Sequence, residues 1–341
     1  MSFHKKIGIL LVNLGTPDAP NRSAVHRYLT QFLTDGRVID INPISRNLLV
    51  RGVIVPFRAG KSASLYKMLW TPAGSPLKVY GYSLKEKVQT ALGTDYIVEL
   101  AMRYQSPSIE EAIEKILASK VSEIVILPLF PQYASASTGS VYEEIMRILS
   151  KKQAIPALRF INSFYDHPLM IEAFAERARE QDISKYDHIL FSYHGLPVRQ
   201  LVKSDLSGQH CQKVENCCAE LNPSNQFCYS AQCFATTKAL TKVLDLKPDQ
   251  YTVCFQSRLG KTPWIEPYTS DVIKKRYDAG DRNILVLCPA FIADCLETTV
   301  EISHEYAEEF ENLGGESLQL VEGLNDHPKW VEAVCNLVKN S

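Results

Sequence analysis

The stretch Asn283-Ile-Leu-Val-Leu-Cys-Pro-Ala-Phe-Ile-Ala-Asp-Cys-Leu-Glu-Thr-Thr-Val-Glu-Ile-Ser-His-Glu305 contains the clearest structural signal in the chain. It opens with an apolar run, Ile284 to Cys288, whose length suits a buried parallel strand. Pro289 ends that strand because proline has no N–H to donate to a neighbouring strand. The residues that follow have a helical pattern. The stretch therefore predicts a strand, a turn and a helix, as in α/β folds.

Three carboxylates, Glu297, Glu301 and Glu305, recur at steps of four along the expected helix. Residues at that spacing share one helical face, where like charges repel one another. A solvated acidic face is one explanation. Two features favour a functional one. The row follows a buried strand directly, where open α/β sheets bind their ligands, and Asp294 and Cys295 add metal-capable side chains to its start.

The composition describes an ordinary globular protein. The chain has 341 residues, 45% of them hydrophobic and 22% charged, which allows two domains or one large one. A formal net charge of −1 gives no electrostatic footprint for nucleic acid. No secretory cleavage site follows the basic start, and no stretch reaches the roughly 20 apolar residues of a membrane span. With nine cysteines, an odd number, we expect reduced thiols and a cytoplasmic setting.

Strand-like segments recur in the same order in the two halves of the chain. The pairs are Lys6–Pro17 with Tyr186–Pro197, Tyr96–Arg103 with Tyr251–Arg258, and Glu123–Phe130 with Asn283–Phe291. In the first pair Gly15 matches Gly195 and Pro17 matches Pro197. One such match could arise by chance, but three in one order indicate a duplicated α/β lobe.

Helical patterns separate these strands. Ser108 to Ala118 begins with a capping box, Ser108 and Glu111, and His167–Glu180 and Phe234–Leu244 are also expected helices. Alternating strands and helices predict a parallel sheet covered on both faces, built twice. We expect an α/β fold with two Rossmann-like lobes, residues 1–160 and 161–341, and a ligand cleft between them.

Residues 42–59 break this pattern. The segment Asn42–Ala59 is apolar but interrupted by Arg46, Arg51 and Arg58. An ordinary buried helix is one interpretation. The other is an apolar lip over the cleft that touches a membrane surface, with its arginines near lipid phosphates or ligand carboxylates.

His194 ends an expected buried strand within Ser192-Tyr-His-Gly-Leu-Pro197. A lone histidine is more often structural than catalytic, but a strand's carboxyl end is where α/β proteins place functional groups. One imidazole facing one carboxylate suits a transient divalent metal better than a structural zinc, which takes four ligands. The same pair suits proton abstraction near neutral pH.

Several motifs together resemble the ferrochelatases over nearly the whole chain. They are Leu11–Pro17, Ser192–Pro197, Phe255-Gln-Ser-Arg258, Pro263-Trp264, and Cys288-Pro289 with Asp294 to Glu301. The resemblance implies insertion of ferrous iron into protoporphyrin IX, held in a cleft between two chelatase-type lobes. In this chemistry a bent ring exposes its nitrogen lone pairs, and two protons leave as the metal enters. Repulsion along the carboxylate row is expected to raise at least one pKa.

The resemblance also implies roles for individual residues. His194 corresponds to the histidine that takes protons from the pyrrole nitrogens, and Glu297 to the carboxylate that faces it at the metal site. Glu301 and Glu305 correspond to an acidic path towards solvent. The residues that resemble porphyrin contacts are Arg103, Tyr104, Ser137 and Trp264. Cys295 stands where some relatives have a histidine, so by analogy it is not an essential ligand.

Five of the nine cysteines fall within the insertion at about 205–233, at Cys211, Cys217, Cys218, Cys228 and Cys233. An incidental polar loop and a zinc knot are two interpretations. A [2Fe–2S] cluster, which takes four thiolates, is the one we favour, with Cys211, Cys217 or Cys218, Cys228 and Cys233 as ligands. Some ferrochelatases bind such a cluster through cysteines near the C-terminus, where this chain has only Cys335.

Other functions remain open from the sequence. A related tetrapyrrole chelatase, using cobalt or acting on coproporphyrin, is the alternative enzyme. A haem or iron–sulfur sensor on the same fold is the non-enzyme alternative, but sensing needs neither His194 nor the carboxylate row. The expected partners are a porphyrin and, peripherally, the inner membrane, with the protein a monomer or homodimer.

Overall fold

The computed structural model describes residues 6–258, 260 and 262–340, and these form two compact units. The first unit contains the residues up to Phe130, Ser135–Asn162 and the residues from Val331 onwards. The second contains Pro131–Ala134 and Ser163–Trp330. Within the described residues no helix is both long and apolar enough to cross a membrane.

The first unit is built on a parallel sheet with the strand order β2-β1-β3-β4. Its strands are β1 (Ile7–Gly15), β2 (Tyr96–Tyr104), β3 (Glu123–Pro128) and β4 (Ala157–Phe160). Residues 9–12 of the central strand have no exposed surface. The continuous apolar sequence of β1 is explained by this burial, because a strand covered on both faces has no solvent side.

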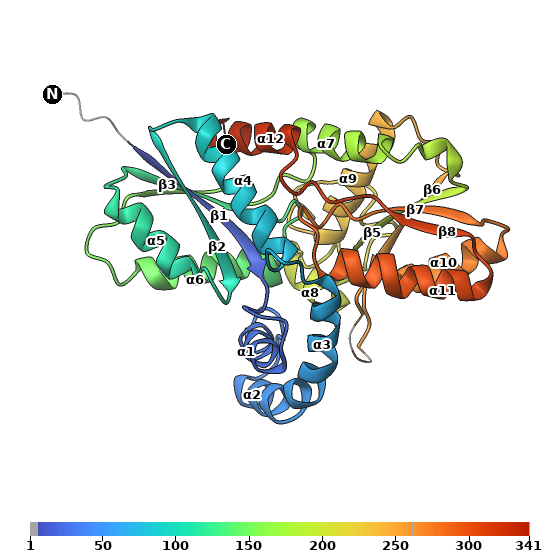
Figure 1. Ribbon diagram of the computed structural model, residues 1–341, viewed down its shortest axis with the longest axis horizontal. Coiled ribbons are helices and arrows are strands. Elements are labelled where there is room, and N and C mark those ends of the chain that lie inside the picture. The colour runs from blue at the N-terminus through green and yellow to red at the C-terminus, as the bar shows by residue number, and fades with distance from the viewer. Residues whose placement is uncertain (1–5, 259, 261, 341) are drawn as a thin grey trace. The chain divides into compact units, whose positions relative to one another are not determined.

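Helices cover both faces of this sheet (Figure 1). Leu10 and Val12 of β1 pack in one core with α5 (Ile109–Ala118) and α6 (Ser140–Leu149). The helix α4 (Pro76–Leu92) packs on the opposite face. The predicted capping box is confirmed, because the Ser108 and Glu111 side chains each accept a hydrogen bond from the other residue's backbone N–H.

Four helical segments follow β1 in the first unit. They are α1 (Arg22–Leu33), α2 (Pro43–Leu49), the π-helical turn η1 (Val50–Ile54) and α3 (Val55–Leu69). The last three follow one another without a break and contain residues 43–59 of the predicted segment, with Asn42 as the N-cap of α2. Val50, Val55 and Ala59 are buried, but Leu48 and Phe57 are 70% and 81% exposed. The segment is therefore not an ordinary buried helix.

The second unit repeats the design of the first. Its parallel sheet has the order β6-β5-β7-β8, formed by β5 (His188–His194), β6 (Tyr251–Gln256), β7 (Asn283–Leu287) and β8 (Ser317–Leu320). The three sequence pairs β1/β5, β2/β6 and β3/β7 occupy equivalent places in the two sheets. The predicted duplicated α/β fold is confirmed.

The helices of the second unit follow the same plan. One face packs α10 (Thr269–Asp278), the π-helix η4 (Leu296–Tyr306) and α11 (Ala307–Leu313) in one core with strand residues such as Leu190 and Val286. On the other face, Thr237 of α9 (Tyr229–Val243) bonds the hydroxyl of Tyr193 in β5, and α9 packs against α7 (Pro168–Arg179). The short helix α8 (Val198–Ser204) follows β5.

Three details differ from the sequence predictions. The expected helix after β7 is π-helical over 11 residues, and α9 begins at Tyr229, five residues before the predicted Phe234. The predicted boundary at residue 160 also differs from the compact units. The helix α12 (Pro328–Asn340) follows β8, yet from Val331 it belongs to the first unit. There its Val338 carbonyl accepts a hydrogen bond from Arg159 of β4 at 2.6 Å.

Candidate active site

His194 and Gln256 end neighbouring strands and face each other in the sheet of the second unit. The next residue, Gly195, donates its N–H to the Gln256 carbonyl at 2.8 Å. A Cβ on Gly195 would lie 2.7 Å from that oxygen and 3.2 Å from the Trp264 ring, so the close packing requires glycine. Two predicted site residues therefore lie close together, because the Trp264 ring packs against the turn that follows His194.

The hydrogen bond of His194 fixes which ring nitrogen can act as a base. Its Nδ1 lies 2.6 Å from the carbonyl oxygen of Gly195. A carbonyl only accepts, so Nδ1 carries the proton and donates. In the neutral imidazole Nε2 then bears the lone pair. His194 is half-buried and lies beside Phe291, with ring centroids 6.2 Å apart.

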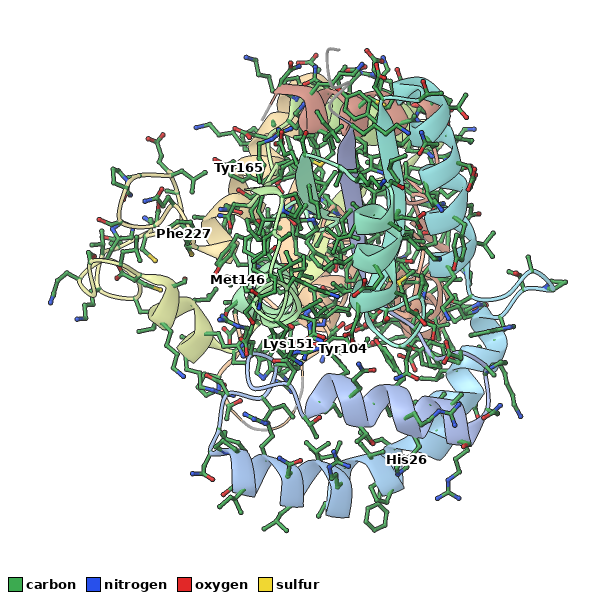
Figure 2. The ribbon with its side chains drawn as sticks, turned by 90° about the vertical axis from the view of Figure 1, so that its left-hand side faces the viewer. His26, Tyr104, Met146, Lys151, Tyr165 and Phe227 are labelled. Carbon is green, nitrogen blue, oxygen red and sulfur yellow. The ribbon has the colours of Figure 1, made fainter. Side chains whose placement is uncertain are left out.

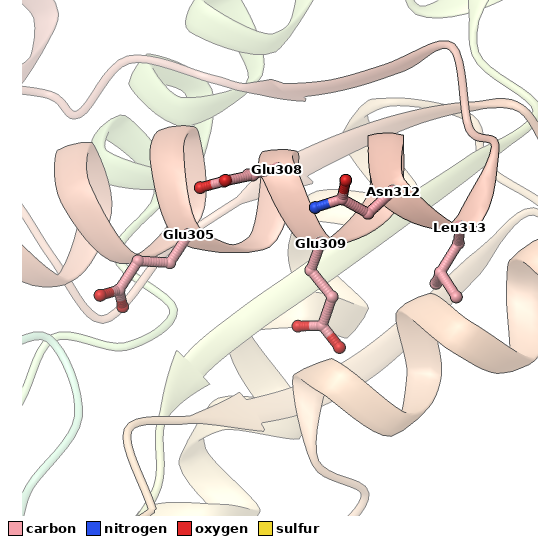
Figure 3. A pocket seen from close by; sticks show the side chains of 5 residues that line it. All are labelled: Glu305, Glu308, Glu309, Asn312 and Leu313. Carbon is pink, nitrogen blue, oxygen red and sulfur yellow. The ribbon is translucent and has the colours of Figure 1, made fainter.

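The carboxylate row lies on η4 and runs from the interior to the surface. Glu297 and Glu301 are half-buried, whereas Glu305 is exposed. Figure 3 shows Glu305 with Glu308 and Glu309 around a surface pocket. Long π-helices are rare and occur often at functional sites. The row of carboxylates therefore runs from the half-buried Glu297 to the solvent-exposed Glu305.

Glu301 accepts four hydrogen bonds. The Ser257 N–H (2.9 Å) and the Tyr306 hydroxyl (3.3 Å) bond one oxygen, and the Ser257 hydroxyl (2.6 Å) and Gln256 amide (3.2 Å) bond the other. Burial raises the pKa of this carboxyl, and the neighbouring charge of Glu297 adds to the rise. The predicted upward shift is confirmed, but burial outweighs repulsion as its cause.

The turn before η4 is held by a separate set of bonds. Asp294 accepts from the Asn325 amide at 2.7 Å and from the Gly323 N–H at 3.2 Å. Cys295 is buried, and burial raises the pKa of its thiol well above the ordinary value.

Arg103, Tyr104 and Ser137 belong to the first unit. Asp35 is the centre of a buried polar cluster there, accepting from Arg103 at 2.8 Å, Tyr104 at 2.9 Å and Ser140 at 2.6 Å. Burial alone would raise the pKa of Asp35, but hydrogen bonds from Ser140 and the Arg37 backbone and the charge of Arg103 lower it.

The three residues of the first unit that were predicted to contact the porphyrin differ in their exposure to solvent. Tyr104, labelled in Figure 2, has no exposed surface, because its ring is packed and its hydroxyl is bonded to Asp35. Arg103 and Ser137 are half-buried, and Ser137 lies on the π-helical turn η2 (Ser135–Gly139). Asp35 and Ser140 were not predicted, since nothing in their local sequence marks them as partners of Arg103.

The cysteine-rich segment between α8 and α9 is irregular around the labelled Phe227 (Figure 2). The Cys217 and Cys218 sulfurs lie 3.8 Å apart. Burial raises the pKa of Cys211 to about 11, whereas a hydrogen bond from Cys218 lowers that of Cys228. Among the described residues no group of three or more His, Cys, Asp or Glu side chains is arranged to hold a metal ion.

The fifth cysteine of the segment is set apart from the other four. Cys233 lies on α9 and is fully buried. All nine cysteines of the chain are free thiols in this structure.

A sequence model of the family described as ferrochelatase matches residues 6–341. The chain belongs to the ferrochelatase family. Ferrochelatase from Coxiella burnetii (strain Dugway 5J108-111) is 43% identical over 340 residues, which cover 99% of this chain and 94% of that protein. Ferrochelatase from Legionella pneumophila (strain Corby) is 45% identical over 331 residues, covering 97% and 98%.

Solved chelatase structures share the fold with this ferrochelatase chain. SirB from Bacillus subtilis with Fe3+ superposes with a TM-score of 0.52 at 13% identity, covering 98% of this chain and 94% of that one. SirB from the subspecies spizizenii, in complex with cobalt, gives 0.51 at 12% identity and the same coverage. At such identities the likeness shows the fold alone. Family membership makes the chain an enzyme, and its activity is insertion of iron into a porphyrin.

Proposed function

We propose that the chain inserts ferrous iron into protoporphyrin IX, with His194 as the base that accepts the pyrrole protons. The observation that carries this role is the 2.6 Å bond from Nδ1 to Gly195, which leaves the Nε2 lone pair as the acceptor. Two pyrrole N–H bonds break, four Fe–N bonds form between the iron and the ring nitrogens, and two protons leave. The iron remains ferrous, so the step needs no oxidant or reductant.

Glu297 is the carboxylate proposed to face the entering iron, together with His194. Carboxylate oxygen and imidazole nitrogen are both suitable donors for iron. Glu301, whose pKa burial raises, is proposed to exchange protons along the row towards Glu305. The exposure of Glu305 supports this direction, because protons must finally reach water.

Arg103, Ser137 and Trp264 are proposed to contact the porphyrin. Trp264 provides an apolar ring beside the His194 turn. Arg103, which already bonds Asp35 and Ser140, would share its guanidinium with a propionate. Tyr104 is proposed to act indirectly, because its hydroxyl and ring are occupied in the Asp35 cluster.

A spectrophotometric insertion assay tests the substrate. Purified protein is mixed anaerobically with ferrous iron and either protoporphyrin IX or coproporphyrin, and loss of the free porphyrin spectrum is followed. The proposal expects faster turnover of protoporphyrin IX, and preference for coproporphyrin would overturn it. Cobalt in place of iron tests the alternative metal, and absence of turnover with every pair would leave the sensor function.

We also propose peripheral membrane contact through the apolar lip, defined as the exposed side chains of residues 42–59. Ile44, Leu48 and Phe57 are each at least 70% exposed, and the exposed cations Arg51 and Arg58 lie among them. Apolar side chains that enter a bilayer beside arginines that meet lipid phosphates are typical of interfacial helices. This attachment would be to the cytoplasmic face of the inner membrane.

A [2Fe–2S] cluster on the cysteine-rich segment is the last proposal about function, with Cys211, Cys217, Cys218 and Cys228 as ligands. The 3.8 Å separation of the Cys217 and Cys218 sulfurs and the lowered pKa of Cys228 support this set. Burial raises the pKa of Cys211 and of Cys217, and the hydrogen bond with Cys228 raises that of Cys218, so iron would have to displace the protons of these three thiols. Cys233, named as a ligand from the sequence, is replaced because it is buried on α9. The irregular segment would have to bring the four thiols closer together to bind the cluster. The bound cluster would then crosslink the loop and make it rigid.

A further inference from the structure

Gln256 is a buried amide at the centre of the site in the second unit. It ends β6 opposite His194 and is 1% exposed. Its side-chain N–H groups donate to the Glu297 carbonyl oxygen at 2.7 Å and to the Glu301 carboxylate at 3.2 Å. Its side-chain oxygen accepts from the Ser192 hydroxyl at 2.7 Å and the Cys288 thiol at 3.8 Å.

The orientation of this amide follows from the chemistry of its neighbours. A backbone carbonyl can only accept, so the amide nitrogen must face Glu297. Both N–H groups and both lone pairs of the oxygen then have partners, and a flipped amide would lose them. Ser192 is itself held by Thr269 at 3.0 Å. The side chain is thus fixed at both ends.

The backbone of Gln256 reaches the opposite part of the site. Its carbonyl oxygen accepts from Gly195, the residue whose own carbonyl holds His194 Nδ1. One residue therefore bonds the turn of the proposed base, the backbone of Glu297 and the side chain of Glu301. None of the roles proposed above is assigned to it.

We propose that Gln256 is a positioning residue for metal insertion, fixing the first turn of η4 and the Glu301 carboxylate relative to the His194 turn. This inference rests on the proposed roles of His194 and Glu297. Gln256 has almost no exposed surface, so it acts through its neighbours and not by touching the porphyrin. Misplacement of reacting groups by about 1 Å can cost roughly 100-fold in rate.

Two variants of nearly the same shape separate the bonds of the amide. Gln256→Glu keeps acceptors for Ser192 and Cys288 but loses the donors to Glu297 and Glu301, and Gln256→Met loses all four bonds. We expect both to lower kcat by about 10- to 100-fold while the KM for porphyrin changes less than about twofold. Ser257→Ala loses one bond to Glu301 and keeps both Gln256 donors, so we expect a smaller fall in kcat.

Gln132→Met is the matched control. Gln132 is equally buried in the second unit, at 2% exposure, and bonds Thr236 and the Pro289 carbonyl. We expect it to lower the melting temperature but to leave kcat and KM of the folded protein unchanged. A Gln256 variant that behaves like this control, or that retains full kcat, overturns the inference. If both Gln256 variants fail to fold, Ser192→Ala, which frees the amide oxygen, gives the same kcat and KM comparison.

His194→Ala in the same series distinguishes failure of the proposed function from failure of the positioning role of Gln256. Its retention of near-normal turnover would overturn the proposed function itself. Loss of turnover in His194→Ala with a normal Gln256→Glu enzyme would overturn only the positioning role.

Discussion

The Nδ1 atom of His194 lies 2.6 Å from the carbonyl oxygen of Gly195, the very next residue. A histidine bonded this closely to its own turn has a fixed ring direction and a fixed neutral tautomer. The imidazole therefore presents one nitrogen, Nε2, to a ligand.

We expect His194→Ala to reduce insertion by about 100-fold or more, because it removes the proposed proton acceptor. Porphyrin binding, measured by fluorescence quenching, should persist, since Trp264 and the surrounding packing remain. The result is read from anaerobic turnover beside that binding curve. Near-normal turnover would show that another group takes the protons.

Glu297→Gln should lower kcat by about 100-fold, because it removes a charge at the metal while keeping the shape. Glu305→Gln should lower it less than about threefold, since an exposed charge is screened and replaceable by water. Both variants are compared at saturating porphyrin and iron. Equal losses would mean that the row acts as one unit and not as a site with an exit.

The cysteine-rich segment gives a colour test. Anaerobically purified protein should be reddish-brown, with iron and acid-labile sulfide in equal amounts. Cys217→Ser or Cys228→Ser should abolish the visible absorption, whereas Cys233→Ser and the distant Cys335→Ser should keep it. Colourless protein with stoichiometric zinc would identify a zinc knot, and protein with neither metal an ordinary loop.

Leu48→Asp with Phe57→Asp should abolish co-sedimentation with anionic liposomes, since burial of these two exposed side chains in lipid is lost. Met146→Asp, at a 53% exposed position on α6, is the matched control and should sediment like the parent protein. Unchanged sedimentation of the double variant would contradict membrane contact through the apolar lip.

Asp35→Asn should destabilise the protein by about 3 kcal/mol at neutral pH, because it leaves the largely buried Arg103 without its carboxylate. The pKa of Asp35 is lowered in the folded state. Its stabilising contribution is therefore complete above the unfolded value of about 3.9 and is lost as pH falls through the folded one. Urea unfolding between neutral and acid pH should show this loss in the parent protein. Asp249→Asn, at an exposed position, is the control. An unaltered loss of stability at acid pH in Asp35→Asn would refute the role of Asp35.

The sequence predicted the fold well because its strands are buried on both faces. Runs such as Ile9–Val12 and Ile284–Leu287 are continuous and apolar, so both their type and their repetition could be recognised. The π-helical winding of η4 could not be predicted. Residues four apart stay on roughly one face in an α-helix and in a π-helix alike, so the spacing of Glu297, Glu301 and Glu305 fits either winding.

The site was predicted in part, for a different reason. His194 and the glutamates stand out because imidazole and a charged row are unusual next to buried strands. The partners of Glu301 could not be recognised, because Gln256 and Ser257 meet it across 44 or more residues of sequence. Such pairings depend on strand register and on a turn at Ser257 with a φ of 65°, which is rare for a residue other than glycine.

The assignment of α12 to the first unit has a consequence for synthesis on the ribosome. The first unit includes residues from β1 at the start of the chain and from Val331 onwards near its end, and Arg159 bonds Val338 directly. Most of the second unit, Ser163–Trp330, is one continuous segment. A nascent chain can therefore complete most of its second unit while its first still lacks a helix. The part made first is the part finished last, and a chain truncated before α12 would expose apolar surface in the unit that emerged earliest.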